Sequence, residues 1–145
     1  MVLAGDLVRA SDGYSDWTAF TPSWVGFTQG NGTIAGAWRR IGNHTIDLVA
    51  QFLFGSTSSI AGSLGLVLPA GLSGDGSAHR QGIPAFALDS STNTGVTGVA
   101  LLQSGGGTTL DRIFGAVTQQ WSSSLPFTWA SGDLCLVQGT VRITT

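Results

Sequence analysis

The sequence predicts an all-β domain, a jelly-roll-like antiparallel β-sandwich of about eight strands. Turn-forming clusters of Gly, Ser, Asn and Pro recur at intervals of roughly 8–12 residues. The segments between them are short and carry alternating apolar residues, and none has the length and period of a long helix. No repeat of about 20–50 residues is present, which disfavours solenoids and propellers.

The clearest strand pair covers 33–41 and 44–54, joined by Gly42-Asn43. Alternation places one apolar set on a single face of the second strand, which predicts a β-hairpin with one core face: Ile46, Leu48, Ala50, Phe52 and Phe54. The opposite face carries Asp47 and Gln51, with Val49 and Leu53 between them. These two apolar residues indicate that a second sheet or another subunit covers this face as well.

Further strands are expected at 64–68, 78–88, 97–103, 110–118 and 133–143. Pro84 predicts an edge strand or a bulge, because proline cannot donate to a ladder, and Gly139 predicts a bulge in the last strand. We expect a single domain, 1–145, with a β core at 30–145 and an irregular N-terminal arm at 1–24. This arm is rich in aromatic residues, which we expect to pack on the chain itself or on a neighbour: Tyr14, Trp17, Phe20 and Trp24.

Charge is scarce: only 10% of the 145 residues are charged, against roughly 25% in an average domain. All the cations are Arg and all the anions are Asp. Lys and Glu are depleted at interface cores, so their absence predicts a surface largely covered by partner subunits. A genome of biased composition, encoding a monomer with a Ser/Thr surface, is the alternative.

Nucleic-acid and membrane binding are not indicated. The net charge is −2, and only Arg39 and Arg40 are adjacent cations, so the basic footprint of a nucleic-acid protein is missing. No apolar run approaches the ~20 residues that span a bilayer. The N-terminus has neither a cationic stretch nor a long apolar segment, so no secretory signal is expected.

No catalytic, metal or cofactor site is predicted. His44 and His79 belong to turn segments without a Gly-x-Ser-x-Gly elbow, and two histidines with one cysteine lack metal-ligand spacing. Cys135 lies in an apolar run and is expected to be a packed strand thiol.

Weaker catalytic and binding signals are carried by three aspartates and by the tryptophans. Asp75, between glycines, matches a calcium loop only faintly. A glycosidase would need a carboxylate pair, for which Asp47 and Asp111 are the candidates, although each fits a solvated strand face better. Exposed tryptophan could stack on sugar rings, while core or interface packing is its commoner role.

Several ordered tracts together resemble virion structural proteins of tailed bacteriophages, especially phages of actinobacteria. The tracts are AGDLVRASD (4–12), TPSW (21–24), GNGT (30–33), RIGN (40–43), FGSTSS (54–59), LP (68–69), PFTWASGD (126–133) and GT (139–140). The resemblance covers nearly the whole chain. It implies a β-rich jelly roll that assembles as a trimer, and it transfers no catalytic residues.

Two roles fit this resemblance. A capsid decoration protein would bind the outer shell, contact the major capsid protein and stabilise the particle. A tail-fibre tip would instead contact other tail proteins and bind a glycan of the host surface. Decoration is favoured, because the domain begins close to Met1 and leaves no attachment region or shaft ahead of it. The expected subunit or capsid contacts are Tyr14, Trp17, Phe20, Trp24, Val49 and Leu53.

Overall fold

The computed structural model describes residues 15–77, 79–115 and 119–144, and the chain there is built from nine β-strands. In order they are β1 (Thr18–Phe20), β2 (Trp24–Thr28), β3 (Thr33–Arg40), β4 (Thr45–Leu53), β5 (Ser59–Val67), β6 (Gln81–Asp89), β7 (Thr94–Leu102), β8 (Thr109–Gly115) and β9 (Leu134–Arg142). The predicted all-β class is confirmed. Within these residues, no helix has the length and apolar character needed to cross a membrane.

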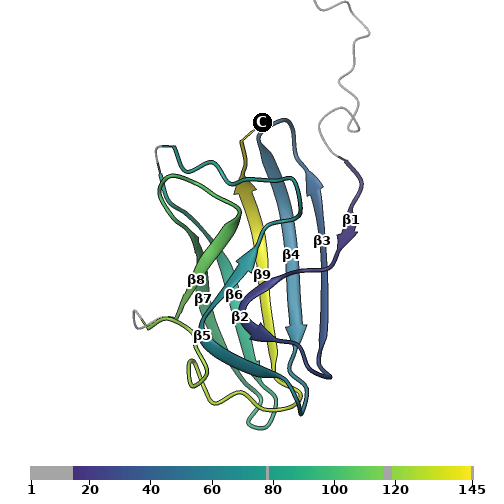
Figure 1. Cartoon of the computed structure of the whole chain (residues 1–145), viewed down its shortest axis with the longest axis vertical. Coiled ribbons are helices and arrows are strands. Elements are labelled where there is room, and N and C mark those ends of the chain that lie inside the picture. The colour runs from purple at the N-terminus through teal and green to yellow at the C-terminus, as the bar shows by residue number, and fades with distance from the viewer. Residues whose placement is uncertain (1–14, 78, 116–118, 145) are drawn as a thin grey trace, which may run out of the picture.

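All nine strands join one antiparallel sheet, in the order β1-β3-β4-β9-β6-β7-β8-β5-β2. The sheet is strongly curled, so that β2 and β5 lie in front of β4 and β9 in the view of Figure 1. The two end strands of this order, β1 and β2, are joined by residues 21–23 alone, which brings the ends of the sheet together. The result is a half-barrel with a sandwich-like interior.

Aromatic rings connect the two facing layers. The ring of Phe52 on β4 lies 4.9 Å from that of Trp24 and 4.1 Å from that of Phe27, both on β2. Side chains alternate across each strand, so β4 buries every second residue completely and turns the others outward. Trp121 and Trp129, from the segment after β8, are also buried and complete this core.

The N-terminal segment is more regular than the sequence indicated. Residues 18–20 pair with β3 and residues 24–28 pair with β5, so the β core begins before residue 30. Residues 1–14, with Tyr14, lie outside the described part of the chain. The predicted hairpin of 33–41 and 44–54 is confirmed as β3 and β4, and its Gly42 takes a positive φ of 72° in the turn.

The predictions for Pro84 and Gly139 need correction. Pro84 lies in β6, which is paired on both sides, with β9 and with β7, so the predicted edge position is wrong. The other alternative, a bulge, is met only by an interruption, because the regular pairing with β9 ends next to Pro84. Gly139 shows no bulge against β4, because the pairing of β4 with β9 runs without a register shift. The two residues act together instead: a Cβ at Gly139 would lie 2.9 Å from Cβ of Ile83 and 3.1 Å from Cδ of Pro84. The missing side chain at 139 makes room for β6.

The pairing of β6 with β9 is confined to Ala85–Leu88 and stops before Pro84. Proline has no N–H to extend it. Beyond the gap, the side-chain amide of Gln81 replaces the missing backbone bonds. Its Nε2 donates to the carbonyl of Arg142 (2.9 Å), and its Oε1 accepts from the N–H of Arg142 (2.7 Å). The two strands are thus bridged at both ends of an opened stretch.

Candidate functional site

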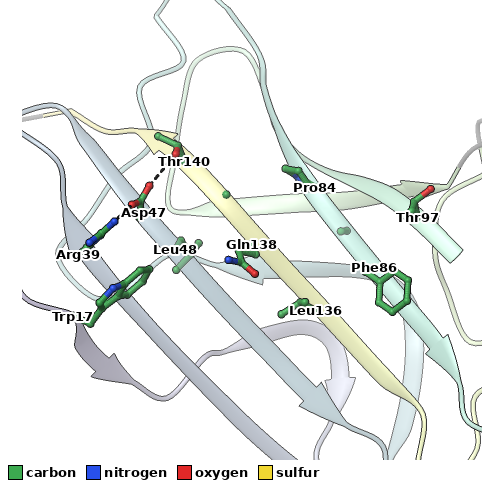
Figure 2. A pocket seen from close by; sticks show the side chains of 12 residues that line it. Trp17, Arg39, Asp47, Leu48, Pro84, Phe86, Thr97, Leu136, Gln138 and Thr140 are labelled. Atoms are coloured by element: carbon green, nitrogen blue, oxygen red, sulfur yellow. Dashed lines mark hydrogen bonds and ion pairs between the residues drawn. The ribbon is translucent and has the colours of Figure 1, made fainter. Parts of the chain in front are cut away.

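A groove of about 640 Å³ lies on the outer face of the sheet, where the pairing of β6 with β9 is interrupted. Pro84, Ala85 and Gly139, which belong to the opened stretch or border it, line the groove. Figure 2 shows two sets of side chains around it, one from the β3–β4–β9 side and one from β6 and β7. Its volume falls in the range of small-molecule sites.

The first side of the groove carries a linked polar network. Arg39 on β3 and Asp47 on β4 are paired in the strand register, and Nη2 and Nε of Arg39 donate to Oδ2 of Asp47 at 2.9 and 3.1 Å. The other oxygen, Oδ1, accepts from Oγ1 of Thr140 on β9 at 2.9 Å. Cross-strand register alone places these three side chains together, because directly opposed residues share a face.

Trp17 extends this network at the rim. The guanidinium carbon of Arg39 lies 4.9 Å from the centre of the Trp17 ring, a cation–π contact. Trp17 nevertheless stays 47% exposed. A large aromatic surface therefore remains open to solvent beside the polar network.

The second side of the groove is mainly apolar. Phe86 on β6 is paired with Leu136 of β9 and with Thr97 of β7. Pro84 lies beside them, and the exposed Gln138 of β9 stands between the two sides (Figure 2). Among the described residues that line the groove, only Arg39 and Asp47 are charged, one of each sign, so this described lining has no net formal charge.

The described residues that line the groove include neither histidine nor cysteine, and their one carboxylate, that of Asp47, accepts three hydrogen bonds. Across residues 15–77, 79–115 and 119–144, no group of three or more His, Cys, Asp or Glu side chains is placed to hold a metal ion. What the groove offers is an aromatic surface, an apolar wall and several fixed hydrogen-bonding groups.

The sequence-predicted contact residues divide between the two faces of the sheet. Trp17 is exposed at the groove, Leu53 is 43% exposed on the outer face, and Val49 is half-buried there. Trp24 is only 8% exposed and Phe20 packs against the core, so both rings serve the chain's own interior. We therefore remove Trp24 and Phe20 from the expected contact surface.

Sequence inspection missed a row of three outward-facing leucines, which we term the leucine row: Leu53 (β4), Leu134 (β9) and Leu88 (β6). Leu134 is paired directly with Leu53 on one side and with Leu88 on the other. Leu134 and Leu88 are half-buried. Alternation within β6 and β9 was the available signal, but only the strand order shows that the three residues are neighbours.

The remaining candidates do not form a site. Asp47 on β4 lines the groove, whereas Asp111 on β8, beyond β9, β6 and β7 in the sheet order, is not among the described lining residues, so the groove does not combine the two carboxylates. His44 and His79 are both exposed. Cys135 is fully buried as expected, and burial raises the pKa of its thiol well above the usual range.

Asp75 is occupied by protein groups. Its Oδ1 accepts from the backbone N–H and the hydroxyl of Ser77, and its Oδ2 pairs with Nη2 of Arg142 at 3.0 Å. The hydrogen bonds from Ser77, with a smaller electrostatic contribution from Arg142, lower the pKa of this carboxyl. The carboxylate therefore holds the loop and the end of β9 together.

No protein-family model matches the chain, and comparisons with curated proteins and with solved structures find no match either.

Proposed function

We propose that the chain is a non-enzymatic structural protein of a tailed-phage virion, which assembles as a homotrimer and binds the outer capsid shell as a decoration protein. The ordered sequence tracts that resemble such proteins supply the virion part of this proposal. The charge-poor surface and the leucine row support the assembly part.

The leucine row is the observation that carries the assembly. Burying apolar surface in a subunit contact is favourable by about 25 cal/mol per Å². A lone chain leaves these apolar residues of three adjacent strands exposed and does not gain this free energy. The three side chains of the leucine row are apolar, and their direct pairing makes one continuous patch. This patch borders Thr33 on β3, and Gln51, Leu136 and Phe86 lie two residues along its three strands on the same face. Such a patch is suited to a subunit contact of the standard ~1,600 Å² class.

Leu53→Ser tests the contact. Leu53 is 43% exposed, so the substitution leaves the core intact, and we expect it to shift the protein from trimer toward monomer in sedimentation velocity at matched concentration. Val25→Ser is the matched control, because Val25 is 39% exposed on β2, at the far end of the sheet order. A wild-type chain that sediments as a monomer would overturn the assembly, as would equal effects of the two substitutions.

Location is tested separately. Purified wild-type chain is mixed with empty capsids of the phage that encodes it and, in parallel, with cells of its host. Saturable binding to capsids that protects them against heat supports the decoration role. Binding to cells without binding to capsids contradicts it and supports a tail-fibre tip.

A further inference from the structure

We propose that the groove between β9 and β6 binds an uncharged pyranose unit of a glycan. This goes beyond the structural role above, since a saccharide site could serve a head or a tail protein. It rests on the groove's geometry and not on the leucine row, so either proposal can fail alone.

The groove is formed by the backbone arrangement of β6 and β9. Pro84 cannot extend the ladder to β9, so the regular pairing is interrupted between Ala85 and Gln81. At this interruption Gly139, without a Cβ, leaves room for Ile83 and Pro84 of β6. Paired strands border the opening on both sides, β4 against β9 and β7 against β6. A cavity held by paired strands on both sides is pre-formed, which lowers the entropic cost of binding a small ligand.

The lining fits a sugar ring in two ways. The face of an aromatic ring carries partial negative charge and attracts the weakly positive C–H groups on the flat side of a pyranose. Trp17 offers such a surface on one side of the groove. The half-buried ring of Phe86, which packs over Gly95 of β7, lies on the other side. The hydroxyl groups at the edge of the sugar need hydrogen-bonding partners. Arg39 and Asp47 lie beside Trp17 on its side of the groove, and Gln138 lies between the two rings (Figure 2).

The charges that line the groove determine whether it favours an anionic or an uncharged polar ligand. Arg39 and Asp47 neutralise each other through a two-point contact, and the other lining residues in the described part of the chain are uncharged. A phosphate or carboxylate would meet no uncompensated cation there and would face the Asp47 carboxylate. An uncharged polyol meets charged hydrogen-bonding groups, which form stronger hydrogen bonds than neutral ones.

The groove is a poorer surface for a second copy of the chain. A subunit contact would have to cover the half-exposed Arg39–Asp47 pair, whose side chains are 32% and 21% exposed, and desolvation of an ion pair is costly. The leucine row, on the same outer face but outside the groove lining, offers an apolar contact without that cost.

The experiment uses saturation-transfer NMR on the purified full chain with five uncharged sugars: D-glucose, D-galactose, D-mannose, L-rhamnose and N-acetyl-D-glucosamine. D-glucuronic acid is the anionic comparison. We expect transfer to at least one uncharged sugar and weaker transfer to the acid. Absence of transfer to all five at tens of millimolar overturns the proposal, and so does preferential binding of D-glucuronic acid.

Variants then locate the site. Trp17→Ala should weaken the affinity for the bound sugar by about tenfold, the effect of losing one binding hot spot, while Trp17→Phe retains most of it. Val25→Ala, exposed outside the groove, is the control. Equal affinity in Trp17→Ala and wild type excludes the groove. Sedimentation of the same samples distinguishes the alternatives: if Trp17→Ala dissociates the trimer, the groove is a subunit contact and the saccharide site is overturned.

Discussion

β9 has two neighbours in the sheet and is paired with them very differently. Against β4 it forms nine register pairs, from Thr45–Arg142 to Leu53–Leu134, whereas against β6 it forms four. The inner faces on both sides are equally buried. The difference therefore comes from the backbone: Pro84, without an N–H, interrupts the ladder with β6, while the ladder with β4 stays intact. Gly139, without a Cβ, leaves room for β6 at the interruption. The closed side stabilises the fold, and the open side provides the groove.

The largest expected effect comes from damaging the closed side. Phe52 on β4 is fully buried, is paired with Cys135 and contacts Trp24, Phe27 and Trp129. Phe52→Ala should lower the free energy of unfolding by about 3–5 kcal/mol, because it leaves a cavity between the facing layers. Urea unfolding measures this. The neighbouring, exposed Gln51→Ala is the control and should change stability by less than about 0.5 kcal/mol; a loss below about 1 kcal/mol for Phe52→Ala would contradict the proposed packing.

A smaller effect is expected at the open side. Gln81 bridges the opened ladder with two bonds to the backbone of Arg142, and its Nε2 also donates to the carbonyl of Asp75 at 2.6 Å. Gln81→Ala should cost about 1–2 kcal/mol and speed hydrogen exchange at the amide of Arg142, because it removes these hydrogen bonds. Gln138→Ala, exposed in the same groove, should change neither quantity. Unchanged exchange at Arg142 in Gln81→Ala would show that the bridge is not needed.

The smallest effect is on the pH dependence of stability at this same open end. The hydrogen bonds from Ser77, followed by the charge of Arg142, lower the pKa of Asp75 in the folded state. A lowered folded pKa gives stabilisation that is present above the unfolded pKa, about 3.9, and is lost as pH falls through the folded pKa. Asp75→Asn should therefore reduce the loss of stability between about pH 4 and pH 2. Thermal unfolding at a series of pH values measures this, and identical acid profiles for variant and wild type would refute it.

The hairpin of β3 and β4 was predictable within one residue at each end, because its signals are local. Alternation over 45–53 and the turn at Gly42-Asn43 require no knowledge of distant residues. β1 and β2 were not predictable in the same way. They are short, lie on either side of Pro22, and are strands only because β3 and β5, far along the chain, provide their hydrogen-bonding partners.

Trp17 and Trp24 illustrate the same limit at the level of the site. Both belong to one aromatic-rich segment and were assigned one role, yet Trp17 is exposed over Arg39 and Trp24 is buried against Phe52. The segment between them crosses from one end of the sheet to the other, so the two rings meet opposite faces of the molecule. No local sequence pattern predicts that the chain crosses between the two ends of the sheet here.

The sequence by itself determined the all-β class, the central hairpin, the buried thiol of Cys135 and the scarcity of charge, because alternation, turn residues and composition are properties of neighbouring or summed residues. Tertiary structure alone decided the strand order, and with it the leucine row and the groove. β9 and β6 are separated by about fifty residues of chain, and the close approach of Gly139 to Ile83 and Pro84 arises only when the curled sheet brings the two strands together.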